Sequence, residues 1–349
     1  MIFSGAAFIK KIYSGRSFSG LILIFFFAIY LLFPSGSSTT DGWNYAAEIK
    51  YAGEIFHPHH LLYNALGYIL CYLPAKAGLG ILECLKALNA FYAVAALFVL
   101  QLILRKLGKN ESIVASVTCL AGFSFSVMRF ATENETYILP LLFSLTASYY
   151  YLLFTLSGDH KFIFQAGLWV TIAVLFHQIF IFWWLGILAG LVFSKKLKPV
   201  LLYVLISLIG PLVYLIVIFN LSGNLSWTGI TGFVSGDFSK NNVHLALTLQ
   251  GLFFSAANFV RSFIQIHGYI FYMIKANPLM IVPAVISTMF FFLALLKLPV
   301  RAGIHNSSQF IVVHIIIILL QFVFALLAAG NAEFMVMIPV LSFLLLPLL

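Results

Sequence analysis

The feature that most constrains this sequence is a succession of apolar stretches, each about as long as a bilayer core is thick. A helix needs about 20 mostly apolar residues to cross that core. These stretches predict an all-α polytopic membrane protein with about ten transmembrane helices. They cover residues 18–33, 82–104, 112–128, 137–156, 162–177, 179–194, 199–221, 278–296, 309–329 and 334–349.

The composition agrees with this prediction. Of the 349 residues, 62% are hydrophobic and only 8% are charged, against about 25% charged residues in an ordinary soluble domain. So few charges cannot cover a soluble surface, which argues against a soluble enzyme, a disordered chain and a nucleic-acid-binding domain. We therefore expect no nucleic acid among the partners, and attribute the net charge of +9 to basic cytoplasmic loops.

The first apolar stretch resembles the hydrophobic region of a signal peptide, because Lys10, Lys11 and Arg16 precede it. No small-x-small cleavage site follows it cleanly. We therefore expect an uncleaved first membrane helix whose N-terminus lies in the cytoplasm.

The positions of the charges test this topology. With both termini in the cytoplasm, 12 of the 19 lysines and arginines fall in cytoplasmic loops, as the positive-inside rule predicts. Eight of the ten acids fall on the external side, which that rule does not explain: either the external loops are simply longer, or carboxylates serve an external site. These acids are Asp41, Glu48, Glu54, Glu83, Glu133, Glu135, Asp237 and Glu333.

The chain divides into three parts on this topology. Residues 1–221 form a transmembrane core with an external loop at 34–81, residues 222–277 form an external loop with an interfacial helix, and residues 278–349 form the C-terminal helices. The apolar stretches 57–74 and 243–275 are interpreted as interfacial or re-entrant helices. In the second stretch, four polar residues would lie within about 80° of one another around a helix. Such a polar stripe fits an interfacial helix or one that lines a cavity. It comprises Gln250, Asn258, Arg261 and Gln265.

The first external loop carries the densest polar signal. Asp41 follows Thr40 as the expected N-cap of an amphipathic helix, with Glu48 on the same face. His57, His59 and His60 then surround Pro58. Three histidines in four residues fit a metal site, donors to a phosphate, or an anchor in the headgroup layer.

Two further external turns contain candidate residues. Arg129, Glu133 and Glu135 place three charges within seven residues. These charges either pair weakly in an exposed turn, or form a site in which the arginine holds an anion and the glutamates bind sugar hydroxyls. His177 lies in a tight turn predicted on the same side, as does Glu333 beside Asn331.

The three cysteines show no metal-type spacing. Cys71 and Cys84 would be able to pair if both lie outside. Three buried or interfacial thiols, including Cys119, are the favoured interpretation.

The loop after the first span contains Asp41-Gly-Trp, Glu48, Glu54 and His57-Pro-His-His-Leu-Leu-Tyr. With these residues it resembles the first external loop of GT-C glycosyltransferases. The nearer likeness is to the protein O-mannosyltransferase and aminoarabinose transferase branch. This resemblance covers residues 18–200 and implies an enzyme that uses a polyprenyl-phosphate sugar, with an acid after the first span as catalytic base. Asp41 is followed by Gly42 rather than a second acid, so a DxD-type metal motif is absent.

The chemistry of such a transfer matches the residues. The leaving phosphate is already a stabilised anion, so the enzyme needs one base and fixed donors for the phosphate. Asp41 is the candidate base, and Arg129 with His57, His59 or His60 is the candidate phosphate clamp. Glu48, Glu133, Glu135 and His177 are further candidates for donor binding, and Arg261 and Lys275 are weaker ones. No cofactor is required by this scheme, and a divalent metal stays open.

The expected partners are a polyprenyl-phosphate sugar, a lipid, glycan or protein acceptor, and membrane lipids. The expected location is a bacterial inner membrane, with the site facing outside. Three rival functions remain: a lipid or solute transporter or flippase, a polysaccharide polymerase or ligase, and a scaffold subunit. A transporter would place ionisable groups near the bilayer midplane, whereas here they gather at one side.

Overall fold

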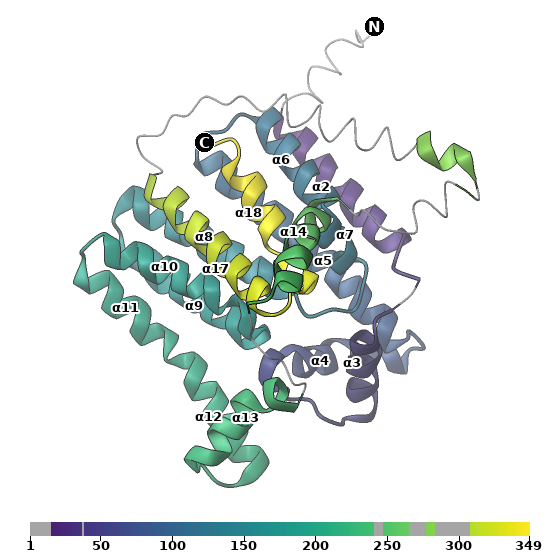
Figure 1. Cartoon of the computed structure of the whole chain (residues 1–349), viewed down its shortest axis with the longest axis vertical. Helices are drawn as coiled ribbons and strands as arrows, with labels where there is room; N and C mark the ends of the chain where they lie inside the picture. Colours follow the sequence, from purple (N-terminus) through teal and green to yellow (C-terminus); the bar gives the residue numbers. More distant parts are fainter. Residues whose placement is uncertain (1–14, 37, 241–246, 265–274, 276, 283–307) are drawn as a thin grey trace, which may run out of the picture.

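The computed structural model describes residues 15–36, 38–240, 247–264, 275, 277–282 and 308–349. All the regular secondary structure of this described part is helical, and it contains no strand. Figure 1 shows the helices gathered into one bundle, with α3 (Thr40–Tyr51) and α4 (Tyr63–Lys76) at one end. We call this the α3–α4 end. The start of α6 (Glu111–Phe123) and the C-terminus lie at the opposite end.

Four helical segments among the described residues are long and apolar enough to cross a membrane. These are α5 (Ile81–Lys106), α8 (Ile138–Ser157), the 26-residue segment Leu197–Ser222, and α17 (Ser308–Leu327). The third comprises α11 (Leu197–Ser207) and α12 (Ile209–Ser222). At about 1.5 Å per residue, 20 residues span the roughly 30 Å hydrocarbon core.

A fifth span is formed if α6 and α7 (Phe125–Ala131) count as one, although they bend by 65°. The bend lies at Ser124, whose backbone leaves the helical region with ψ 140°. Its hydroxyl donates to the carbonyl oxygen of Ala121 at 2.6 Å, which satisfies an acceptor at the end of α6. The predicted single span over 112–128 is therefore broken, and α7 carries Arg129 away from the axis of α6.

Four shorter apolar helical segments correspond to other predicted spans. The first two are Phe18–Leu32, which is part of α2 (Gly15–Leu32), and α9 (His160–Phe176). The third is Gln178–Phe193, which comprises η2 (Gln178–Phe180) and α10 (Ile181–Phe193). The fourth is Ala332–Leu345, which contains η5 (Ala332–Met335) and α18 (Ile338–Leu345). The prediction of ten spans is thus not confirmed, since four or five meet the length criterion. The predicted span 278–296 lies mostly outside the described residues.

Close helix packing in the bundle depends on small residues. Gly186 and Gly190 on α10 lie one turn apart and face α17, where an added Cβ would come within 2.3 Å of Ile317 and 2.2 Å of Val313. Spacing of small residues by four lets two helix backbones approach closely within a membrane. The side chain of Gln309 donates to the carbonyl oxygen of Gly190 at 2.8 Å, which joins the same two helices.

The end opposite α3 and α4 is closed by a charge network. Arg105 at the end of α5 donates to both carboxylate oxygens of Glu111, at 2.7 and 3.0 Å. Ser19 of α2 donates to Glu111 and accepts from Arg105. Bidentate arginine–carboxylate pairing is strong and directional, so the network holds α2, α5 and α6 together.

The predicted external loop forms a layer of short helices. It contains α3, η1 (Pro58–His60) and α4. The predicted N-cap is wrong: Thr39 caps α3, with its hydroxyl accepting from the backbone N–H of Gly42 at 2.9 Å. Asp41 lies inside the first turn, where a carboxylate is stabilised by the positive end of the helix dipole.

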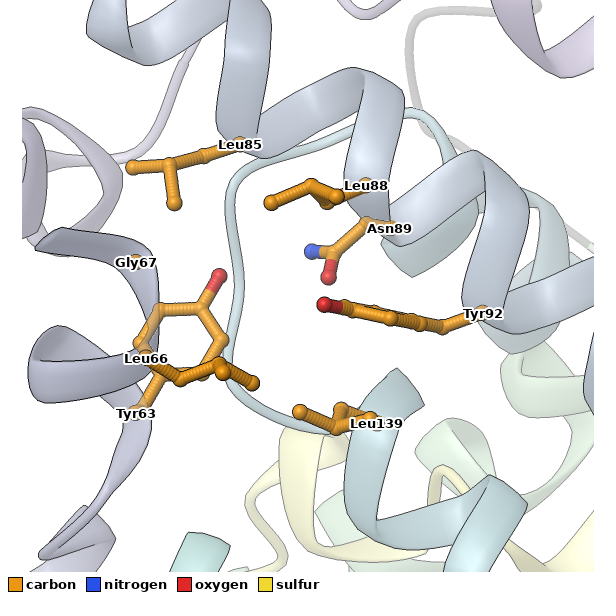
Figure 2. Close-up of a pocket in the computed structure, with 8 residues that line it drawn as sticks. All are labelled: Tyr63, Leu66, Gly67, Leu85, Leu88, Asn89, Tyr92 and Leu139. Carbon is orange, nitrogen blue, oxygen red and sulfur yellow. The ribbon is translucent and has the colours of Figure 1, made fainter. Parts of the chain in front are cut away.

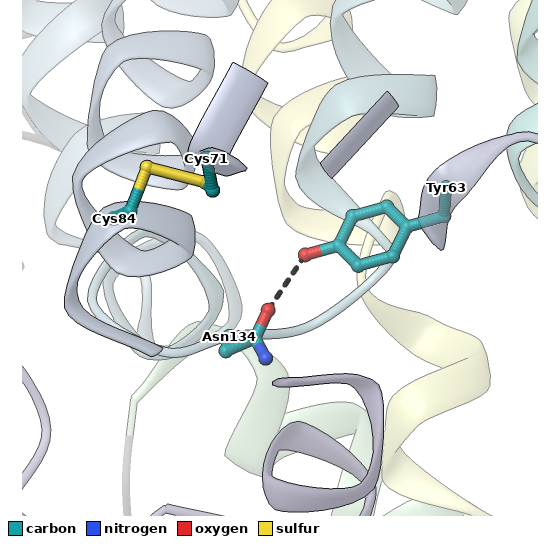
Figure 3. The surroundings of a disulfide bond; sticks show 4 residues. All are labelled: Tyr63, Cys71, Cys84 and Asn134. Atoms are coloured by element: carbon teal, nitrogen blue, oxygen red, sulfur yellow. Dashed lines mark hydrogen bonds between the residues drawn. A yellow bond between two sulfur atoms is a disulfide. The ribbon is translucent and has the colours of Figure 1, made fainter. Parts of the chain in front are cut away.

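Cys71 of α4 and Cys84 of α5 form a disulfide, with 5.9 Å between their Cα atoms (Figure 3). The expectation of three thiols is therefore wrong for this pair, and Cys119 is the cysteine that stays unpaired. The reason is tertiary, because α4 folds back on α5 and buries both sulfurs beside Ile49 of α3. The bond attaches the layer of short helices to a long helix of the bundle.

The predicted interfacial helix within 243–275 is seen as α14 (Leu249–Phe263), which is too short to meet the criterion for a span. Part of its polar stripe packs against the chain before η5: Asn258 donates to the carbonyl oxygen of Gly330 at 2.6 Å and accepts from Arg261 at 2.8 Å, whereas Gln250 is exposed. Gln265 lies outside the described residues, and Lys275 is exposed.

The disulfide predicts a measurable loss of stability. Replacing both cysteines, Cys71→Ser with Cys84→Ser, should lower the free energy of unfolding by up to about 3 kcal/mol, because the crosslink closes a loop of about 15 residues. Differential scanning fluorimetry in detergent measures the shift in Tm, and reductant should reproduce it in the native protein.

Cys119→Ser is the matched control and should leave the Tm and its response to reductant unchanged. Alkylation of the denatured, unreduced protein should modify one cysteine. Modification of all three without reductant would contradict the crosslink.

Candidate functional site

The segment 132–137, between α7 and α8, is the centre of the α3–α4 end. All its side chains are buried, which rules out the exposed turn, one of the two alternatives that the sequence left open. Asn134 explains the burial, since its side-chain N–H donates to the carbonyl oxygen of Gly42 at 2.6 Å. Its side-chain oxygen accepts from the Tyr63 hydroxyl at 2.8 Å (Figure 3). One side chain thus ties this segment to both α3 and α4.

Gly42 allows α3 to approach this segment. A Cβ at this position would lie 2.8 Å from the carbonyl oxygen of Asn134 and 3.1 Å from the hydroxyl of Thr39. Any side chain here would push α3 outward. A glycine directly after Asp41 therefore has a packing reason.

Asn89 of α5 holds the same segment from the opposite side. Its side-chain N–H groups donate to the carbonyl oxygens of Glu133 and Glu135, both at 2.8 Å. Figure 2 shows the polar ends of Asn89, Tyr63 and Tyr92 turned toward a small cavity between α4 and α5. The cavity has a volume of about 10 Å³, which is room for one water-sized probe and far too little for a sugar.

Glu135 of this segment interacts electrostatically with two carboxyl groups from distant parts of the chain, those of Asp41 and Glu333. The Thr39 hydroxyl donates to Glu135 at 2.6 Å, and the Tyr137 hydroxyl donates to Glu333 at 3.1 Å. The pKa of Glu135 is raised to about 8, first by burial and then by the charges of Glu333 and Asp41, against the hydrogen bond from Thr39.

The same environment acts on Glu333. Burial raises the pKa of Glu333 and the charge of Asp41 adds to the shift, whereas Tyr137 and Arg129 act to lower it. Carboxylates that lie close together and are partly shielded from water raise one another's pKa, which favours their protonated forms. The site therefore combines the exposed carboxyl of Asp41 with two carboxyls whose pKa values are raised.

A cationic patch borders the carboxyls. Arg129 donates to the hydroxyl of Ser35 at 3.0 Å, and the ammonium of Lys86 donates to the carbonyl oxygen of Ser35 at 2.8 Å. Both cations face the buried carboxyl of Glu133, at 3.8 Å from Arg129 and 3.7 Å from Lys86. Two cations beside one carboxylate leave a net positive charge where α2 meets the layer of short helices.

The histidines form the other border of the carboxyls. The ring of His60 packs against those of Tyr45 and His57, with centroids 4.7 and 4.9 Å apart. Tyr137 stacks on His177 at 4.7 Å, and this histidine lies 6.4 Å from His60. The side chain of His60 is 8% exposed, and its Nδ1 has no hydrogen-bond partner among the described residues.

Burial makes two of these histidines poor cations. It lowers the pKa of His177 to about 3 and lowers the pKa of His60 well below its ordinary value; neighbouring histidines add to both shifts. At neutral pH both rings are uncharged, so they can donate or accept hydrogen bonds but do not supply positive charge. Arg129 and Lys86, rather than His60 and His177, therefore supply positive charge for an anion.

Other predicted residues have structural partners. Glu48 pairs with His57 at 2.8 Å and accepts from Asn64 at 2.7 Å, which closes α3 onto the turn before α4. His59 contacts the side-chain oxygen of Gln178 at 3.2 Å. Arg261 donates a hydrogen bond to the side-chain oxygen of Asn258 in its own helix. Among the described residues, Arg261 and Asn258 are not part of the group that contacts the three carboxyls.

Several site residues were not predicted from the sequence. Lys86 lies within a stretch interpreted as a membrane span, and its position four residues from the start of that stretch was the available signal. Tyr45 and Tyr137 gave no signal, because tyrosines are frequent in this chain. Glu333 was placed on the correct side, but its contact with Tyr137 spans 196 residues of sequence.

The described residues contain no group of three or more histidines, cysteines, aspartates or glutamates placed to hold a metal ion. His57 and His60 come together, but the nearest acid to them is Glu48, which is paired with His57. The geometry of this region therefore offers hydrogen bonding and charge rather than a preformed metal centre.

Comparisons with models of protein families, with curated proteins and with solved structures find no match for this chain. The functional proposal therefore rests on the residues described above.

The raised pKa of Glu135 predicts a pH dependence of stability. Between about pH 4.5 and about pH 8 the unfolded chain has lost the proton that the folded protein keeps. The free energy of unfolding should therefore fall as the pH rises through this window. Glu135→Gln removes the titrating group, so its Tm should fall less between pH 5 and pH 9 than that of the native protein.

Glu54→Gln changes an exposed acid of the first external loop and is the matched control; it should keep the native slope. If Glu135→Gln and the native protein show the same pH dependence, Glu135 does not hold its proton.

Proposed function

We propose that this protein is an integral membrane glycosyltransferase of the inverting type. It moves a sugar from a polyprenyl-phosphate donor to a lipid, glycan or protein acceptor at the α3–α4 end. The observation that carries the proposal is the convergence of Asp41, Glu135 and Glu333 beside the cations Arg129 and Lys86. The resemblance of the first external loop to GT-C enzymes supports it.

Asp41 is the base in this proposal. Its side chain is exposed at the start of α3, where an acceptor hydroxyl or amine can reach it. As the acceptor attacks the anomeric carbon, its proton passes to the Asp41 carboxylate and the bond to the phosphate oxygen breaks. Glu135, whose pKa is raised to about 8, keeps its proton at neutral pH and donates a hydrogen bond to a sugar hydroxyl without adding negative charge near the departing phosphate. Glu333, whose pKa is raised by burial, is a second hydrogen-bonding group for the sugar.

The cationic patch binds that phosphate. Arg129 is 30% exposed and Lys86 12% exposed, so the arginine is the more accessible donor. Fixed donors aimed at a leaving anion stabilise the charge that develops in the transition state. The polyprenyl chain would lie along the exposed apolar side chains of Leu32 and Phe33, which come shortly before Ser35.

The disulfide supports an external site. Such bonds persist in oxidising compartments such as the bacterial periplasm and are rare in the cytosol. Cys71 and Cys84 join the helices that carry Tyr63 and Asn89, so the site and the disulfide lie on the same side. We therefore place the protein in a bacterial inner membrane with the α3–α4 end outward.

Transport is the less well supported alternative. The four long spans have no charged residue in their central parts. The buried His314 is satisfied: its Nδ1 donates to the carbonyl oxygen of Phe310 at 2.7 Å, and its Nε2 accepts from Ser148 at 2.7 Å. Both ring nitrogens of His314 are thus engaged within the bundle and are not open to a transported solute.

Asp41→Asn should lower transfer from a polyprenyl-phosphate sugar by at least about 100-fold, because it removes the general base. Release of polyprenyl phosphate, measured over a panel of lipid-linked sugars in nanodiscs, tests this. Asp159→Asn, an exposed acid at the opposite end, is the matched control and should keep native turnover. Near-native turnover by Asp41→Asn would show that Asp41 is not the base. If neither the native protein nor any variant showed turnover, the protein would be a scaffold subunit and not an enzyme.

Arg129→Ala should weaken binding of a non-hydrolysable donor analogue by about tenfold or more, because it removes a charged hydrogen-bond donor. Acceptor affinity should stay within about twofold. Arg129→Lys should restore part of the donor affinity, and Lys106→Ala at the opposite end should change neither. Equal donor affinities for Arg129→Ala and the native protein would exclude this residue from the phosphate site.

A further inference from the structure

A separate cavity lies among α3, α4 and the start of α5, away from the three carboxyls. Its volume is about 190 Å³, and its walls include Ile49 and Lys50 of α3 and Tyr68, Tyr72 and Lys76 of α4. None of these residues belongs to the candidate catalytic site. We call this cavity the lysine groove.

The lysine groove is positively charged. Lys50 and Lys76 line it, and no acid does so among the residues that the structure describes. The ammonium of Lys76 lies 4.4 Å from the centre of the Tyr72 ring, which holds it against the wall. Of the acids nearby in sequence, Glu48 is engaged by His57 and Asn64, Glu83 folds over Gly80 at the start of α5, and Glu54 is exposed in the turn after α3 and does not line the groove.

An apolar surface adjoins the groove. Ile69 and Leu73, one turn apart on α4, are 69% and 71% exposed, and Leu70 and Leu79 are also exposed. A short helix with such a face, with lysines and tyrosines beside it, is typical of segments that lie in the membrane interface. The groove therefore presents cations next to a surface suited to acyl chains.

We propose that the lysine groove binds the phosphate headgroup of an anionic phospholipid, whose chains pack beside Ile69 and Leu73. Lys50 and Lys76 neutralise the phosphate, and the hydroxyls of Tyr68 and Tyr72 offer donors to its oxygens. Two lysines at a membrane surface favour anionic over zwitterionic lipid by roughly tenfold or more. This inference does not depend on the transfer reaction.

Native mass spectrometry of the purified full chain tests the proposal. The protein is titrated with phosphatidylglycerol, with phosphatidylcholine of the same acyl chains, and with glycerol phosphate. Lys50→Gln with Lys76→Gln removes the charge. Ala75 also lines the groove, so Ala75→Trp fills it but keeps both lysines. Lys196→Gln with Lys198→Gln, two exposed lysines at the opposite end, is the charge-matched control.

We expect one phosphatidylglycerol to bind at least about tenfold more tightly than phosphatidylcholine. That preference should be lost in both groove variants and kept in the control. Undiminished preference in the groove variants, or equal binding of the two lipids by the native protein, would overturn the proposal. Binding of glycerol phosphate as tightly as the lipid would show a soluble-anion site instead and would also overturn it.

Discussion

Two buried asparagines, Asn89 and Asn134, hold the segment 132–137 on which the rest of the site depends. A buried segment without regular structure needs partners for its backbone groups, since an unpaired one costs about 1–3 kcal/mol. Asn89 donates to two carbonyl oxygens of this segment, and Asn134 fastens it to α3 and α4. Gly42 leaves the space in which α3 can approach. Without these contacts the carboxyls of Glu133 and Glu135 would not be held beside the start of α3.

The electrostatics of the site follow from that placement. Glu133 is neutralised by Arg129 and Lys86, while Glu135 and Glu333 lie where burial and neighbouring charge favour the protonated form. The charge therefore changes across the site, from the cationic patch, through carboxyls whose pKa values are raised, to the neutral rings of His60 and His177. Such an arrangement suits a substrate that is anionic at one end and rich in hydroxyls beside it.

Much of the coarse architecture could be predicted from the sequence. The apolar stretches indicated the long helices, and the side assigned to each loop placed Asp41, Arg129, Glu135 and His177 at one end, as the structure does. The details failed where tertiary contacts decide. The polar run around Glu133 looks like an exposed turn, and only its contacts with Asn89 show why it is buried. The pairing of Cys71 with Cys84 depends on how α4 folds back, which their spacing does not reveal.

The central claim is that the α3–α4 end binds a lipid-linked phosphate. A cryo-electron microscopy structure of the protein in nanodiscs with an added polyprenyl phosphate tests it most directly. We predict phosphate density within hydrogen-bonding distance of Arg129 or Lys86 and next to Asp41, with the chain running along α2. Phosphate density near the middle of the long helices, beside His314, would contradict the account and indicate a transport pathway.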